Sequence, residues 1–136
     1  MIRLIITGPR ACTKNNAVIS EISEYITQLG GVDEIITGGA SGVDMMAKQY
    51  AREHAISYRE FIPNWQNDLN AAGMIRDTRM AEYATHLLVF VTEGTKESQN
   101  LMDEAQRNHL RIRMITPREK GMVRGERPVL LSPSGV

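Results

Sequence analysis

Short apolar runs alternate along the chain with longer segments whose apolar residues recur every three or four positions. Unbroken apolar runs are typical of strands buried on both faces of a parallel sheet, whereas the longer spacing is typical of amphipathic helices. The runs predict five strands, at residues 2–7, 34–37, 57–62, 86–91 and 112–115. The periodic segments predict four helices, at about residues 18–29, 43–54, 72–83 and 95–108.

Strands that alternate with helices predict an α/β fold, because parallel neighbours need helical crossovers. We expect a single Rossmann-like three-layer sandwich with a mostly parallel five-stranded sheet. From Pro117 onward, several Pro and Gly residues prevent a continuous helix. The sequence therefore predicts a Rossmann-like domain over residues 1–116 and an irregular tail over residues 117–136. Val129, Leu130 and Leu131 of that tail are expected to dock on the body or on a neighbouring subunit.

Length and composition limit the classes of protein to which the chain can belong. The length of 136 residues suits one domain, and the contents of 42% hydrophobic and 24% charged residues are ordinary for a soluble globular protein. A formal net charge of zero disfavours a dedicated nucleic-acid binder. The single cysteine, Cys12, excludes an internal disulfide and fits the reducing cytoplasm. No secretion signal, membrane span or metal-ligand spacing is present, so we expect a cytoplasmic protein without membrane, metal or cofactor.

Three glycine-containing loops follow predicted strands, at residues 7–10, 38–42 and 92–95, and each also contains a hydroxyl residue. Ligands of open α/β sheets bind at the carboxyl ends of the strands, and a glycine turn before a helix presents N–H groups to an anion. We therefore predict that the loops converge on the phosphate or sugar of a nucleotide-type ligand. The candidate ligand-binding residues of the first two loops and the following helix are Thr7, Gly8, Arg10, Gly38, Gly39, Ala40, Ser41 and Asp44.

Simpler interpretations exist for the same residues. Ser41 and Asp44 have the spacing of a capping box, and starting the helix is their more common role, which leaves room for ligand contact. The glycines serve either a tight turn or binding, and Arg10 is either an exposed loop charge or a phosphate contact. The loop is not a Walker A motif, since no Gly-Lys-Ser/Thr follows. Trp65 is expected to plug the core rather than to stack on a base.

Three charged residues further along have structural interpretations when taken alone. Arg76 and Arg79 lie beside Asp77 in the third predicted helix, where a solvated charged face is the ordinary arrangement. Glu97 is expected in the first turn of the fourth helix, and the helix dipole favours an acid there by about 0.3–1 kcal/mol.

Read together, the motifs resemble the YspA-like branch of the SLOG superfamily. The resemblance is carried by the loop 38–44, Trp65, the segment 71–80, an apolar strand and Gly94-Thr95, and it spans residues 2–115. This superfamily also contains the lonely-guy phosphoribohydrolases and the DprA recombination mediators. The resemblance implies a Rossmann-like fold and a nucleotide or nucleotide-derived ligand, with no established reaction for this branch.

The lonely-guy enzymes cut the N-glycosidic bond of a nucleoside 5′-monophosphate. Arg76 and Glu97 fall on the arginine and glutamate of their pattern, so the resemblance implies catalytic roles for both. Gly94 and Thr95 fall on its Gly-Thr, and Arg79 is a further candidate ligand contact. The chain departs from the pattern at Glu93, Asp77 and Ser98, which together lower the positive charge around an anion site.

Three functions are therefore expected, in decreasing order. The first is a small-molecule binding module that recognises a nucleotide-derived ligand, as a sensor would. The second is an N-glycosidic hydrolase using Arg76 and Glu97. The third, a DprA-like nucleic-acid protein, is disfavoured by the neutral charge and the single tryptophan. A homodimer is expected because the superfamily often pairs through helices.

Overall fold

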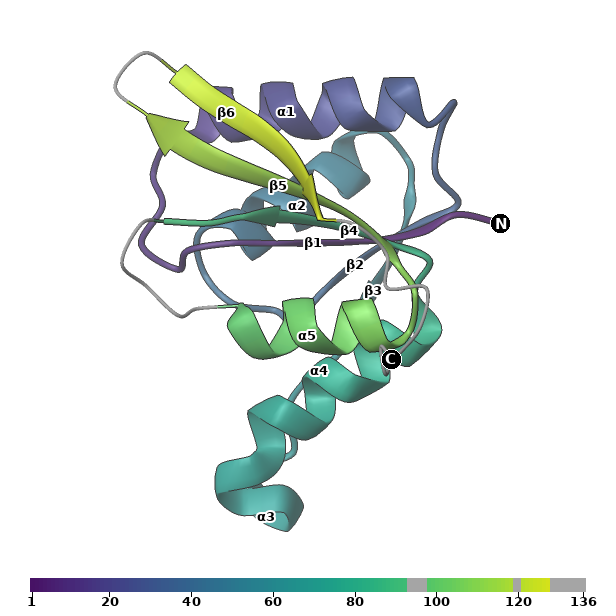
Figure 1. Ribbon diagram of the computed structural model, residues 1–136, viewed down its shortest axis with the longest axis vertical. Helices are drawn as coiled ribbons and strands as arrows, with labels where there is room; N and C mark the ends of the chain where they lie inside the picture. Colours follow the sequence, from purple (N-terminus) through teal and green to yellow (C-terminus); the bar gives the residue numbers. More distant parts are fainter. Residues whose placement is uncertain (93–97, 119–120, 128–136) are drawn as a thin grey trace.

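A six-stranded sheet with the order β3-β2-β1-β4-β5-β6 forms the centre of the computed structural model (Figure 1), which describes residues 1–92, 98–118 and 121–127. Its strands are β1 (Arg3–Thr7), β2 (Glu34–Thr37), β3 (Ser57–Glu60), β4 (His86–Phe90), β5 (Arg111–Arg118) and β6 (Gly121–Arg127). Strands β1 to β5 pair in parallel, and β6 pairs antiparallel with β5. The Rossmann-like sandwich is confirmed, with six strands rather than five.

Helices cover both faces of this sheet (Figure 1). Helices α1 (Asn15–Gln28) and α2 (Val43–Glu53) share one hydrophobic cluster with one face, and α4 (Ala72–Tyr83) and α5 (Gln99–Arg107) share a second cluster with the other. Within β1, Leu4 and Ile6 belong to the first cluster and Ile5 to the second, all with no exposed surface. This alternation explains the unbroken apolar run, because both faces of the strand are buried. Strand β3 differs, since it lies at the sheet edge and its residues are alternately exposed.

The chain changes direction across the sheet beside β1. Strand β1 is connected through α1 to β2 on one side, while β4 pairs with β1 on the other side. The helix that follows β1, α1, covers one face of the sheet, and the helix that follows β4, α5, covers the other face. In open α/β sheets such a topological switch point leaves a crevice at the carboxyl ends of the two strands.

The carboxyl-terminal region corrects the expected tail. Strand β5 continues past the expected domain end to Arg118, and residues 121–127 return along it as β6, so the expectation of an irregular segment is wrong there. Glycines weaken a strand but do not prevent an edge ladder, and the pairing extends from Ile112–Arg127 to Arg118–Gly121. Arg124 of β6 also forms an ion pair with Glu21 of α1, at 2.7 Å. Val129, Leu130 and Leu131 lie outside the described residues.

Between β3 and α4 the chain forms a short projecting arm, made of α3 (Trp65–Asp68) and the 3-10 turn η1 (Leu69–Ala71) (Figure 1). Trp65 in this arm is 59% exposed, so its expected role as a core plug is wrong. The helix α3 packs on η1 and the start of α4 rather than on the sheet, which leaves no core for the indole ring to fill. Across the described ranges, no helix has the length and apolar character needed to cross a membrane.

Candidate functional site

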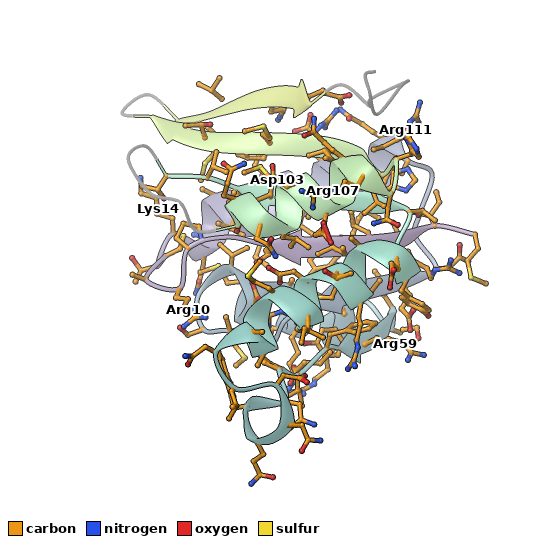
Figure 2. All side chains as sticks on the ribbon, turned by 60° about the horizontal axis from the view of Figure 1, so that its bottom comes forward. Arg10, Lys14, Arg59, Asp103, Arg107 and Arg111 are labelled. Atoms are coloured by element: carbon orange, nitrogen blue, oxygen red, sulfur yellow. The ribbon has the colours of Figure 1, made fainter. Side chains whose placement is uncertain are left out.

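A cavity of about 400 Å³ lies at the switch point, where the loop after β1 meets the loop after β2. Its lining comes from both loops, from the start of α2, from α4 and from the start of α5. The lining residues are Thr7, Gly8, Arg10, Ala40, Asp44, Arg76, Asp77, Ser98 and Leu101. Figure 2 shows Arg10 and Lys14 at the carboxyl end of the parallel strands, away from Arg111 at the start of β5.

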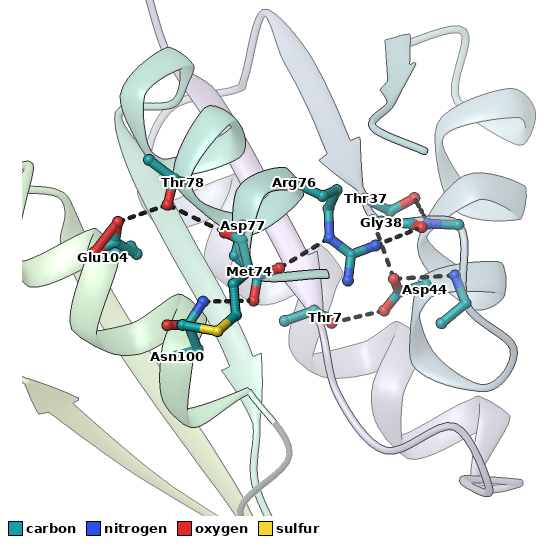
Figure 3. A network of polar contacts seen from close by, with 12 residues as sticks. Thr7, Thr37, Gly38, Asp44, Met74, Arg76, Asp77, Thr78, Asn100 and Glu104 are labelled. Carbon is teal, nitrogen blue, oxygen red and sulfur yellow. Dashed lines mark hydrogen bonds and ion pairs between the residues drawn. The ribbon is translucent and has the colours of Figure 1, made fainter. Parts of the chain in front are cut away.

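Asp44 joins the two loops from the first turn of α2. One carboxylate oxygen accepts a hydrogen bond from the Thr7 hydroxyl at 2.8 Å, and the other accepts from the backbone N–H groups of Gly38 and Ala40 at 3.1 and 3.3 Å (Figure 3). The residue is only 2% exposed. This burial raises the pKa of Asp44, and the same three hydrogen bonds together with the charge of Arg76 oppose the rise. The carboxylate is therefore committed to holding the loops together.

The start of α2 differs from the expected capping box. Its N-cap is Gly42, with φ +70° and no side-chain cap bond, so the prediction that Ser41 and Asp44 cap the helix is wrong. The Ser41 hydroxyl instead donates to the Arg10 carbonyl oxygen at 3.1 Å. A Cβ on Gly42 would lie 2.3 Å from the Pro9 carbonyl oxygen. The close approach of the two loops thus requires glycine at position 42. Because Gly42 is the N-cap, Ser41 lies one residue before the cap and bonds to the other loop.

Arg76 on α4 points into the cavity and is held by two groups. Its Nε donates to the Asp77 carboxylate at 2.9 Å, and its Nη1 donates to the Gly38 carbonyl oxygen at 3.1 Å (Figure 3). The same approach leaves no room for a Cβ on Gly38, which would lie 2.5 Å from Nη1. A solvated charged face is therefore the wrong interpretation for Arg76, whose side chain is 17% exposed. It fits Arg79, which is exposed and does not line this cavity.

A second polar cluster supports the outer side of the glycine loop. The Thr37 and Tyr58 hydroxyls lie 2.5 Å apart, the Tyr58 hydroxyl donates to Glu60 at 2.7 Å, and Lys48 lies 3.7 Å from Glu60. Burial is the main cause that raises the pKa of Tyr58, so the phenol stays protonated as a donor. The N–H of Gly39 donates to the Thr37 hydroxyl at 3.2 Å, which places Gly39 in this supporting cluster rather than in the cavity lining.

The structure thus brings together most of the predicted residues of the first two loops. Asp77 and Asn100 are contacts that sequence reasoning did not assign: Asn100 of α5 donates to the second Asp77 carboxylate oxygen at 3.1 Å. A contact between two helices separated by a strand leaves no spacing signal, whereas the adjacent Arg76-Asp77 pair was visible as a departure from the enzyme pattern. Gly94, Thr95 and Glu97 lie outside the described residues. Within the described ranges, no group of three or more His, Cys, Asp or Glu side chains could hold a metal ion.

The comparison with protein families agrees with this geometry. The family model of the YspA, cpYpsA-related SLOG family matches residues 2–67. This match supports the YspA-like branch of the SLOG superfamily as the family of the chain. The matched segment contains β1, the loops 7–10 and 38–42 and Asp44, whereas Arg76 and Asp77 lie beyond it. None of the curated proteins matches the chain.

Proposed function

We propose that this SLOG protein binds a nucleotide or nucleotide-derived small molecule in the cavity beside β1. The observation that carries the proposal is the convergence of the two loops of the family-matched segment on one cavity at the switch point. SLOG membership itself suggests a nucleotide-related ligand. The cavity volume of about 400 Å³ also falls within the range usual for small-molecule sites, which is roughly 300–1,000 Å³.

The lining supplies the chemistry that such a ligand needs. Arg10 offers a positive charge at the loop after β1, and the amino-terminal end of α2 adds the positive end of a helix dipole. Leu101 of α5 is the apolar side chain of the lining on the α5 side. A ligand with both an anionic group and an apolar or weakly polar ring would use all three features.

Titration calorimetry with AMP, GMP, CMP, UMP and ADP-ribose tests the proposal. We expect at least one ligand to bind with a Kd below about 1 mM, which corresponds to about 4 kcal/mol of binding free energy. Arg76→Ala should weaken that binding, because Arg76 lines the cavity. Arg79→Ala is the matched control, since Arg79 lies on the same helix but is exposed and outside the lining. Absence of binding, or equal losses in the two variants, would count against this site.

A second function, phosphoribohydrolase activity, is favoured by the position of Arg76 in the cavity. In this reaction, water would replace the base at the sugar C1′ and release the free base with ribose 5-phosphate. Arg76 would hold the substrate, and Glu97 would stabilise the positive charge of the sugar or orient water. The role of Glu97 rests on the resemblance alone.

A reversed-phase assay separates turnover from binding. Base released from a nucleoside monophosphate by the wild type, and not by Glu97→Gln, would support the hydrolase. Intact substrates together with measurable binding would support the binding module. We rank the binding module first because Asp77 and the Gly38 carbonyl already occupy the Arg76 guanidinium.

Two expectations about partners belong to the same proposal. A homodimer predicts twice the monomer mass of 15.2 kDa in light scattering at micromolar concentration. The nucleic-acid alternative predicts a gel shift at low salt, which the net charge of zero disfavours.

A further inference from the structure

The α4 wall of the cavity has an unusual charge arrangement for a site that would accept a phosphate. Among the described lining residues, Arg10 and Arg76 are cationic, and Asp44 and Asp77 are acidic. The Asp77 carboxylate accepts a hydrogen bond from Arg76 Nε at 2.9 Å, whereas among the residues that the structure describes Arg10 forms no ion pair with a carboxylate. The two arginines of one cavity are thus unequal as anion contacts.

The geometry of Arg76 explains this inequality. Arginine binds phosphate best through two parallel N–H donors along one edge of the guanidinium. In this structure Nε donates to Asp77 and Nη1 donates to the Gly38 carbonyl oxygen, so two of the three guanidinium nitrogens are already engaged within the protein (Figure 3). A phosphate that reached this edge would also meet the negative charge of Asp77.

Asp77 is itself fixed in place. One of its oxygens accepts from Arg76 and the other accepts from the Asn100 side chain on α5, at 3.1 Å. The neighbouring contact between the Thr78 hydroxyl and Glu104, at 2.7 Å, also joins α4 to α5. Because the Asp77 side chain is only 15% exposed and held from two sides, it is not free to swing into solvent when an anion arrives.

We propose that Asp77 is a specificity-determining residue that keeps phosphate groups away from Arg76. This inference rests on the proposed function and refines its ligand class. The ligand turns its uncharged part, the ribose hydroxyls or the base, toward Arg76 and Asp77, where a carboxylate accepts from hydroxyl or amino groups. Its phosphate group lies toward Arg10. The favoured ligand is therefore one whose sugar or base, rather than its terminal phosphate, contacts α4.

Inorganic phosphate is the probe for this proposal, and the arginine Nε–H signals in ¹H–¹⁵N NMR spectra are the readout. In the wild type, we expect phosphate to shift the Arg10 signal and to leave the Arg76 signal in place. Asp77→Asn keeps the shape of the side chain but removes its charge. In this variant the Arg76 signal should shift at a phosphate concentration about tenfold below the highest one at which the wild-type signal stays in place, since close charge pairs near a protein surface are worth a factor of that order or more.

Three further variants make the test specific. Asp77→Glu keeps the charge and should behave like the wild type. The double variant Asp77→Asn with Arg76→Ala should lose the gain in phosphate affinity, because the gain acts through Arg76. Asn100→Ala removes one of the two groups that hold Asp77 and should give a smaller gain. Asn100→Ala also allows the proposal to be tested if the Asp77→Asn variant does not fold.

The outcomes decide the proposal in either direction. A phosphate-induced shift of the wild-type Arg76 signal, or equal phosphate affinity in the wild type, Asp77→Asn and Asp77→Glu, would overturn it. A gain confined to the variants that remove or loosen the Asp77 charge would support it. Because the probe is phosphate alone, the result is separate from the nucleotide panel. A panel without binding, beside a phosphate gain in Asp77→Asn, would remove the proposed function and leave the charge role of Asp77 standing.

Discussion

The cavity has an aspartate on each of two sides, Asp44 on α2 (the α2 wall) and Asp77 on α4 (the α4 wall), and the two have different roles. On the α2 wall, Asp44 is 2% exposed and accepts three hydrogen bonds from Thr7, Gly38 and Ala40. On the α4 wall, the Asp77 side chain is 15% exposed and accepts one bond each from Arg76 and Asn100. Asp44 builds the loops that form the cavity, whereas Asp77 sets the charge that the cavity presents. Burial and the nature of the donors, rather than residue type, separate the two roles.

The largest contrast is expected between two glycines, Gly42 at the N-cap of α2 and Gly73 in the first turn of α4. Gly42→Ala should destabilise the fold by about 3 kcal/mol or more, because a side chain at φ +70° is strained and its Cβ would lie 2.3 Å from the Pro9 carbonyl oxygen. Gly73→Ala on α4 is the control, since nothing lies within 4 Å of its Cβ. It should stabilise the fold by up to about 1 kcal/mol. Urea unfolding measures both, and a similar loss in the two variants would contradict the account.

The two aspartates provide the next contrast. Asp44→Asn should cost about 2–3 kcal/mol, because an amide cannot accept from all three donors and buried N–H groups are left without a partner. Asp77→Asn should cost less than about 1 kcal/mol, since it weakens a partly exposed ion pair and keeps an acceptor for Arg76. The comparison uses the same substitution in both walls and is measured by urea unfolding at neutral pH. Equal losses would show that the α4 wall is as structural as the α2 wall.

The pH dependence of stability sharpens the comparison further. Burial raises the pKa of Asp44 above its ordinary value of 3.8, so the folded state binds this proton more readily than the unfolded state. The free energy of unfolding contributed by Asp44 is therefore greatest below pH 3.8 and falls as the pH rises through the folded pKa. The stability difference between the wild type and Asp44→Asn should shrink as the pH rises from about 3.5 to 7. A difference that grows over this range would mean that the hydrogen bonds outweigh burial.

The smallest expected effect concerns the support of Asp77. Asn100→Ala removes a single hydrogen bond and should lower the free energy of unfolding by about 0.5–1.5 kcal/mol. The backbone amide signals of Gly38 and Ala40, which report on the α2 wall, should keep their positions in NMR spectra. Movement of those signals would show that the two walls are coupled through α5.

The sequence was most informative where physical constraints are local. The apolar runs predicted β2 at residues 34–37 and the periodicity predicted α4 at residues 72–83, both with the bounds observed. The loops 7–10 and 38–42 were also expected to meet, because the carboxyl ends of parallel strands lie at one edge of a sheet. These features depend on short-range patterning and on topology.

Other features depend on contacts between distant segments and could not be read from spacing. The Ser41 and Asp44 pair matched a capping box, but Asp44 bonds to Thr7 and to the loop backbone instead. Strand β6 was not predicted because its glycines have a low propensity for strands. The structure holds it as an edge strand through its pairing with β5, which requires little intrinsic strand propensity. Trp65 was expected in the core because large aromatic residues are usually buried, yet the arm that carries it has no sheet to cover.

The most direct test of the central claim is to map where a nucleotide binds. The wild-type protein would be titrated with AMP and ADP-ribose while its backbone amide signals are recorded by NMR. The account predicts the largest shifts at Gly8, Gly38 and Ala40, at the meeting of the two loops, and small shifts at Gly125 on the distant strand β6. Shifts concentrated away from these loops, or no shifts at millimolar ligand, would contradict it.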